Sequence, residues 1–137
     1  MLLAAGCKKD SDNEPQTLAS DKQCPAWTVP ADYDYTSSMT AVVKVDIARQ
    51  YSFASDFEVK DDDVLAAFIG ETCVGKVSPD EGFFILYVAG TEGTVTLRYY
   101  SAFYRNIFVA RDAFPYKNDE NLGTIAEPFV PAFVVAE

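Results

Sequence analysis

The chain has 137 residues, a length that fits one domain and a tail. Hydrophobic residues make up 49% of it, which is enough for a sizeable core, and the formal net charge of −10 argues against nucleic acid as a partner because an acidic surface repels phosphates. The sequence has no histidine, which excludes serine–histidine and cysteine–histidine nucleophiles and histidine-ligated metals. We therefore expect a non-enzymatic protein without a cofactor.

The first residues have the composition of the end of an export signal. Met1 to Gly6 are apolar or small, and Ala4-Ala5-Gly6 stands directly before Cys7. This stretch resembles the lipobox of bacterial lipoproteins, although Ala4 stands where that motif usually has Leu. The resemblance implies that 1–6 are the remnant of a signal peptide and that Cys7 carries acyl chains such as palmitate, which anchor a protein stably when two or more are present. The alternative is a frayed N-terminus with an incidental cysteine.

Charged residues follow the cysteine. Lys8 and Lys9 come first and acidic residues fill much of 10–14. This order resembles the export signal of surface lipoproteins in Bacteroidetes, which implies an outer-membrane location facing the cell exterior, although a solvated linker has the same composition. We expect 7–23 to be the acylated cysteine and a flexible tether, and 24–137 to be the folded domain.

The rest of the chain has the pattern of short strands separated by turns. In chain order the segments with this pattern are 39–47, 64–70, 72–78, 83–90, 94–101, 106–110 and part of 129–135. The segment 83–90 is apolar on both faces, which predicts a central strand. Pro128 and Pro131 favour an edge position for the last strand. The pattern predicts an antiparallel β-sandwich of about seven to eight strands.

Several short motifs follow one another from Trp27 to Phe129. They are Trp27, Ser38-Met39-Thr40, the acidic turn at 61–63, Ala67-Phe68 with Gly70, Cys73 with Gly75, a tyrosine-containing strand at 94–101, and Leu122-Gly123-Thr124. Their order resembles an uncharacterised β-sandwich domain common in Bacteroidetes surface lipoproteins. The resemblance implies a cell-surface module and brings no known chemistry with it.

Two glycines in these motifs predict local structure. Gly70 and Gly75 are expected to allow a tight hairpin and a close approach of two strands. Ala67 and Phe68, beside them, are expected in the core.

Cys24 and Cys73 remain once Cys7 is acylated. An even pair in an exported protein predicts a disulfide, and closing a loop of this length stabilises a fold by about 4 kcal/mol in the chain-entropy treatment. Two independent thiols are the alternative.

Asp61, Asp62 and Asp63 form the densest acidic cluster. Calcium takes oxygen ligands, so these carboxylates are a weak calcium candidate, although they lack the spacing of an EF-hand. A solvated turn is the simpler interpretation, and we expect no metal.

The aromatic side chains at one hairpin end are the candidate binding residues. Alternation directs Tyr99 inward and Tyr100 to the opposite face, and Phe103 and Tyr104 follow in a turn. We therefore expect Tyr100, Phe103 and Tyr104 to form an exposed patch that contacts a sugar or a partner protein. Packing of these rings into the core is the alternative.

These features predict a lipid-anchored, non-enzymatic module of the cell surface that takes part in binding or adhesion. Two alternatives remain open. One is a glycan-binding lipoprotein of a carbohydrate-uptake system, and the other is a structural accessory subunit of a surface complex.

Overall fold

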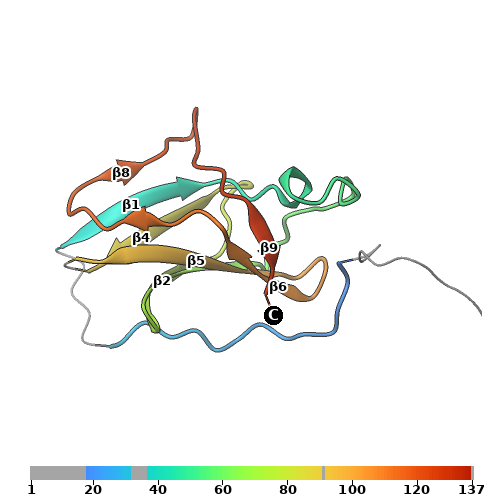
Figure 1. Ribbon diagram of the computed structural model, residues 1–137, viewed down its shortest axis with the longest axis horizontal. Coiled ribbons are helices and arrows are strands. Elements are labelled where there is room, and N and C mark those ends of the chain that lie inside the picture. The colour runs from blue at the N-terminus through green and yellow to red at the C-terminus, as the bar shows by residue number, and fades with distance from the viewer. Residues whose placement is uncertain (1–17, 32–36, 91, 137) are drawn as a thin grey trace, which may run out of the picture.

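The structure is a computed structural model that describes residues 18–31, 37–90 and 92–136. Within these residues nine strands and one short 3-10 helix, η1, form a sandwich of two sheets (Figure 1). In chain order the elements are β1 (Ser38–Val43), η1 (Ile47–Arg49), β2 (Val64–Ile69), β3 (Thr72–Val77), β4 (Phe84–Ala89), β5 (Thr94–Ser101), β6 (Asn106–Ala110), β7 (Phe114–Pro115), β8 (Asn121–Leu122) and β9 (Phe133–Val135). The predicted all-β sandwich is confirmed. In the part of the chain that the structure describes, no helix has the length and hydropathy needed to cross a membrane.

The smaller sheet has the strand order β4-β1-β8. β1 pairs antiparallel with β4, with Met39 opposite Val88, and parallel with β8, with Thr40 opposite Asn121. The sheet is therefore mixed, which corrects the expectation of a purely antiparallel sandwich. The parallel pair is possible because the chain reaches β8 by crossing over from β7 in the other sheet rather than by a hairpin.

The larger sheet has the order β3-β2-β5-β6-β9, and β7 adds to the edge of β5 beyond β6. All of its pairs are antiparallel. β2 and β3 form a hairpin that turns at Gly70, whose φ of 64° is a left-handed conformation that glycine adopts without strain. β9 lies at the edge of the sheet, where the prolines in its segment predicted it.

The core fills the space between the sheets. Every second residue from Met39 to Ile47 is buried, as the alternation predicted, although β1 ends at Val43 and Ile47 belongs to η1. β5 contributes alternate side chains in the same way. The largest side chains that are fully buried are Tyr99, Phe84, Phe108 and Phe133.

β4 lies at an edge of the smaller sheet, so the prediction of a central strand is wrong. Its outer neighbour is β3 of the larger sheet, which does not hydrogen-bond to it as a paired strand. The approach is close, because a Cβ atom added at Gly75 would lie 2.3 Å from the carbonyl oxygen of Tyr87. The expectation that Gly75 allows close strand approach is confirmed, and the edges of β3 and β4 shield each other.

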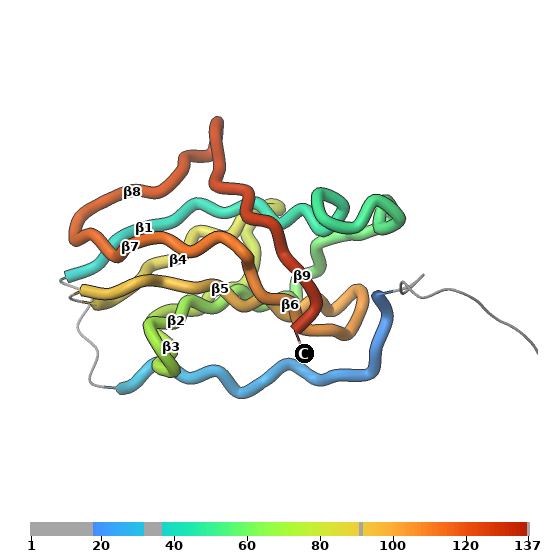
Figure 2. The backbone as a smooth tube through the Cα atoms, viewed as in Figure 1, coloured from blue at the N-terminus to red at the C-terminus, as the bar shows by residue number. Residues whose placement is uncertain are grey.

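Residues 18–31 form an extended segment, which we call the N-terminal strap. It crosses the face of the larger sheet that points away from the smaller one (Figure 2). The strap begins in the core, where Leu18 is buried, and its backbone amides at Ser20 and Lys22 donate to the carbonyls of Tyr104 and Arg105. The last residues of the expected tether, 18–23, therefore lie against the domain.

Candidate binding surface

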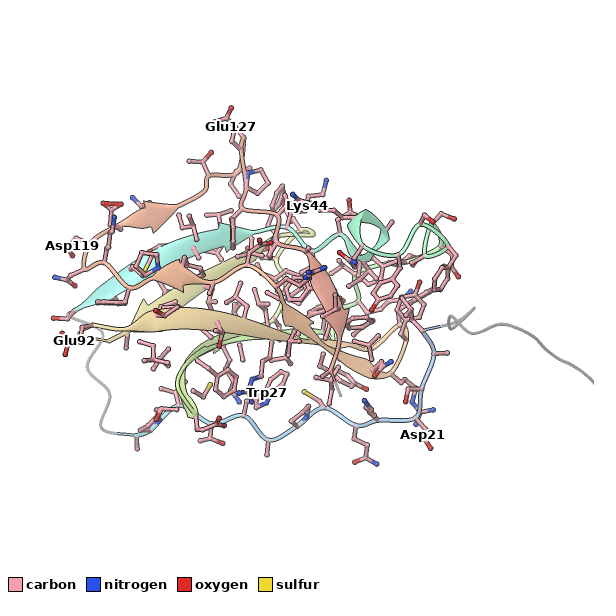
Figure 3. All side chains as sticks on the ribbon, viewed as in Figure 1. Asp21, Trp27, Lys44, Glu92, Asp119 and Glu127 are labelled. Carbon is pink, nitrogen blue, oxygen red and sulfur yellow. The ribbon has the colours of Figure 1, made fainter. Side chains whose placement is uncertain are left out.

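The N-terminal strap covers a second, smaller apolar cluster. Ala66, Phe68 and Cys73 are buried on the outer face of β2 and β3, and Trp27 packs on them from the strap (Figure 3). The rings of Trp27 and Phe68 meet edge to face with centroids 6.0 Å apart, and the guanidinium of Arg98 lies 4.0 Å from the centroid of Phe68. This face of the larger sheet is therefore packed rather than open. Phe68 is buried as predicted, although it belongs to this outer cluster and not to the core between the two sheets.

The predicted exposed patch at Tyr100, Phe103 and Tyr104 does not exist. Tyr100 is 8% exposed and lies under the strap, where its hydroxyl donates to the carbonyl of Lys22 at 3.1 Å. The prediction failed because it treated the outer face of β5 as uncovered.

The loop between β1 and β2 covers the other two rings. Tyr104 is 7% exposed and stacks on Phe57, with centroids 5.8 Å apart and an interplanar angle of 19°. Its hydroxyl donates to Asp56 Oδ1 at 3.1 Å, and Phe103 is half-buried against the same Phe57. These rings close the end of the sandwich and leave no aromatic platform there.

Asp63 turns into the fold instead of facing a cation. Its Oδ2 accepts hydrogen bonds from the hydroxyl of Tyr99 and from the amide of Lys60, and its Oδ1 accepts from the amide of Ala102 at 2.7 Å. Asp61 and Asp62 are exposed. Across the described ranges no three acidic or cysteine side chains are grouped to hold a metal, so the weak calcium candidate at 61–63 is not supported.

Burial raises the pKa values of the carboxyl and phenol groups in this region. It raises the pKa of the Asp63 carboxyl, and the hydrogen bonds from Tyr99 and the two amides oppose that shift. Burial also raises the pKa of Tyr99, and the charge of Asp63 adds to the effect. For Tyr104, burial and then the hydrogen bond to Asp56 raise the pKa to about 12. Asp63 and Tyr99 are both fully shielded from solvent, so this pair is an internal contact of the fold that a ligand does not reach.

The two cysteines that the structure describes are free thiols, so the predicted disulfide between Cys24 and Cys73 is wrong. Cys24 is exposed on the strap, whereas Cys73 is buried and donates to the carbonyl of Gly75. Trp27 and Val29, rather than Cys24, are the strap residues that pack on the cluster containing Cys73. Burial raises the pKa of both thiols, which keeps them protonated near neutral pH. Cys7, the predicted lipidation site, lies outside the described residues.

A hollow of about 480 Å³ lies beside β4, within the size range of small-molecule sites. We call it the β3–β4 hollow. It is lined by Ser38, Lys76, Val77, Ile85 and Tyr87. The lining therefore combines an aromatic ring, two aliphatic side chains, a hydroxyl and an ammonium group.

The fold positions these groups for simple reasons. Phe84 and Leu86 of β4 point into the core, so alternation directs Ile85 and Tyr87 outward. Tyr87 is 58% exposed, more than any other large hydrophobic side chain among the described residues. The ammonium of Lys76 donates to the carbonyl of Trp27 at 2.8 Å, so it is turned toward the strap.

Sequence reasoning missed Tyr87 because 83–90 was expected to be buried on both faces. A signal was available, since tyrosine at the outward register of a strand brings a hydroxyl that a dry central position does not readily satisfy. Comparison with models of known protein families, with curated proteins and with solved structures finds no match.

Proposed function

We propose that this chain is a lipid-anchored, non-enzymatic binding module of the cell surface, of the kind found in Bacteroidetes surface lipoproteins. The sequence Ala4-Ala5-Gly6-Cys7 and the lysines that follow it support the anchor and its export. The order of motifs from Trp27 to Phe129, and the two-sheet β-domain that they form, support the module.

The observation that carries the proposal is the end of the sandwich at which the chain leaves toward Cys7. The amide of Ser20 donates to the carbonyl of Tyr104 at 2.8 Å, and the side-chain amide of Asn106 donates to the carbonyl of Leu18 at 2.9 Å. The strap is thus fastened beside the turn between β5 and β6. An anchor at Cys7 places this end of the domain toward the membrane.

The β3–β4 hollow begins at the opposite end. Ser38, which lines it, is the first residue of β1 and pairs with Ala89, the last residue of β4. Figure 3 shows Glu92 and Asp119 at one end of the molecule and Asp21 at the other. Val77, which also lines the hollow, pairs with Leu65 level with Tyr99, so the hollow runs along the side of the sandwich between the two ends.

The anchor is tested by replacing Cys7 in a protein expressed behind a complete lipoprotein signal peptide. We expect the unchanged protein to incorporate labelled palmitate, to fractionate with the outer membrane and to be cleaved by protease added to intact cells. Cys7→Ser should abolish the label and release the protein, whereas Cys24→Ser, the matched control on the exposed thiol of the strap, should change neither.

An unlabelled protein with an intact Cys7 would contradict the anchor. A labelled protein that protease reaches only after cell lysis would contradict its display at the cell surface.

A further inference from the structure

We infer that the β3–β4 hollow binds a neutral carbohydrate, with the ring of Tyr87 as the surface on which a sugar ring stacks. The inference rests on the proposed function and names the ligand class of the proposed binding module. It starts from Tyr87, whose ring is 58% exposed beside a hollow. Phe53 and Ile125 are the other exposed large hydrophobic side chains of the described chain, and neither lines the hollow.

The chemistry of the lining matches the two kinds of surface on a sugar. A pyranose presents an apolar face of C–H groups and a rim of hydroxyls. Tyr87, Ile85 and Val77 offer apolar contact, while Ser38 donates or accepts hydrogen bonds.

An added peptide strand fits this place poorly. Strand addition needs a free edge whose amides and carbonyls can pair with the incoming chain. The edge of β4 faces β3 at close range, and the carbonyl of Tyr87 lies against the backbone at Gly75. Recognition in the hollow must therefore use side chains.

Charge favours a neutral ligand. The chain carries a net charge of −10, so an anionic polysaccharide is repelled at long range. Lys76 is the charged group in the lining, and its ammonium already has an acceptor. A neutral sugar avoids the repulsion.

The test is a glycan array probed with the folded domain, followed by titration of the retained sugars. We expect retention of neutral glycans. Tyr87→Ala should weaken binding by about thirty-fold or more, the usual effect of removing an aromatic anchor. Tyr87→Phe keeps the stacking ring and should lose only a few-fold. Ile125→Ala, the control at an equally exposed site outside the hollow, should bind as the unchanged protein does.

Thermal melts of each variant establish that it is folded. The inference is overturned if the unchanged domain retains no sugar, if it retains only acidic glycans, or if folded Tyr87→Ala binds like the unchanged protein. Concentration-dependent dimers that Tyr87→Ala abolishes would assign the hollow to a second copy and also overturn it. None of these results bears on the labelling of Cys7, so the two proposals fail separately.

Discussion

Asp63 shows how one residue decides the local fold. Three donors converge on its buried carboxylate, namely the hydroxyl of Tyr99 in β5, the amide of Lys60 in the loop before β2 and the amide of Ala102 in the turn after β5. The sequence shows three adjacent aspartates but not which of them turns inward, because the choice depends on Tyr99, which is far away in the chain. That dependence is why the cluster was considered as a calcium site and is instead a tie between two loops.

Asp63→Ala should lower the free energy of unfolding by about 3 kcal/mol, because it leaves these buried donors without an acceptor. Asp62→Ala, on the exposed neighbour, should change it by less than about 0.5 kcal/mol. Urea unfolding followed by circular dichroism measures both. Equal effects of the two substitutions would show that the inward carboxylate does not tie the loops together.

At the scale of elements, the strands were predictable and the segments that cover them were not. Alternation in 39–47 and 94–101 placed the buried faces correctly, because period-two patterning follows from strand geometry. The N-terminal strap has no such periodicity and contains Pro25 and Pro30, so nothing local indicated that it lies on the larger sheet. The prediction for Tyr100 failed for this reason. The edge position of β4 was missed because strand order depends on contacts between distant segments.

The packing of Trp27 on Phe68 leads to a testable prediction about the N-terminal strap. Trp27→Ala removes the ring that packs on Phe68 and should destabilise docking of the strap by about 2 kcal/mol. The amides of Ser20 and Lys22, which donate to the turn between β5 and β6, should then exchange with deuterium faster, while core amides of β5 keep their protection.

Thr28→Ala is the control, since Thr28 is exposed and its hydroxyl bonds only locally to the carbonyl of Ala26. If the strap amides exchange at the same rate in Trp27→Ala and in the unchanged protein, the ring does not hold the strap.

At the scale of the whole molecule, the candidate site emerges from the fold as a whole. The β3–β4 hollow takes residues from β1, β3 and β4, which meet only after the two sheets pack. No spacing in the sequence brings Ser38, Lys76 and Tyr87 together. A fold class could therefore be predicted from the sequence, whereas the binding surface required the structure.

The stability of the whole domain should fall at alkaline pH. The ionisation of buried tyrosine side chains contributes to this fall. Tyr99 and Tyr104 have pKa values raised above the ordinary 10.0, to about 12 for Tyr104, chiefly through burial. The folded state thus holds these protons more tightly than the unfolded chain does. Their contribution is fully present below pH 10 and is lost as the pH rises through the folded values, by at most about 1.4 kcal/mol per pH unit for each group.

Urea unfolding at a series of pH values, with phenolate absorbance recorded alongside, measures this loss. Self-repulsion of a chain with a net charge of −10 also grows at high pH, so the Tyr104→Phe variant is needed to separate the two effects. This variant keeps the stacking on Phe57 and removes one titrating hydroxyl, so its stability should fall less steeply between pH 10 and 12. Identical slopes for the variant and the unchanged protein would show that Tyr104 ionises in the folded state as it does in the unfolded chain, and that Tyr99 and charge repulsion cause the alkaline loss.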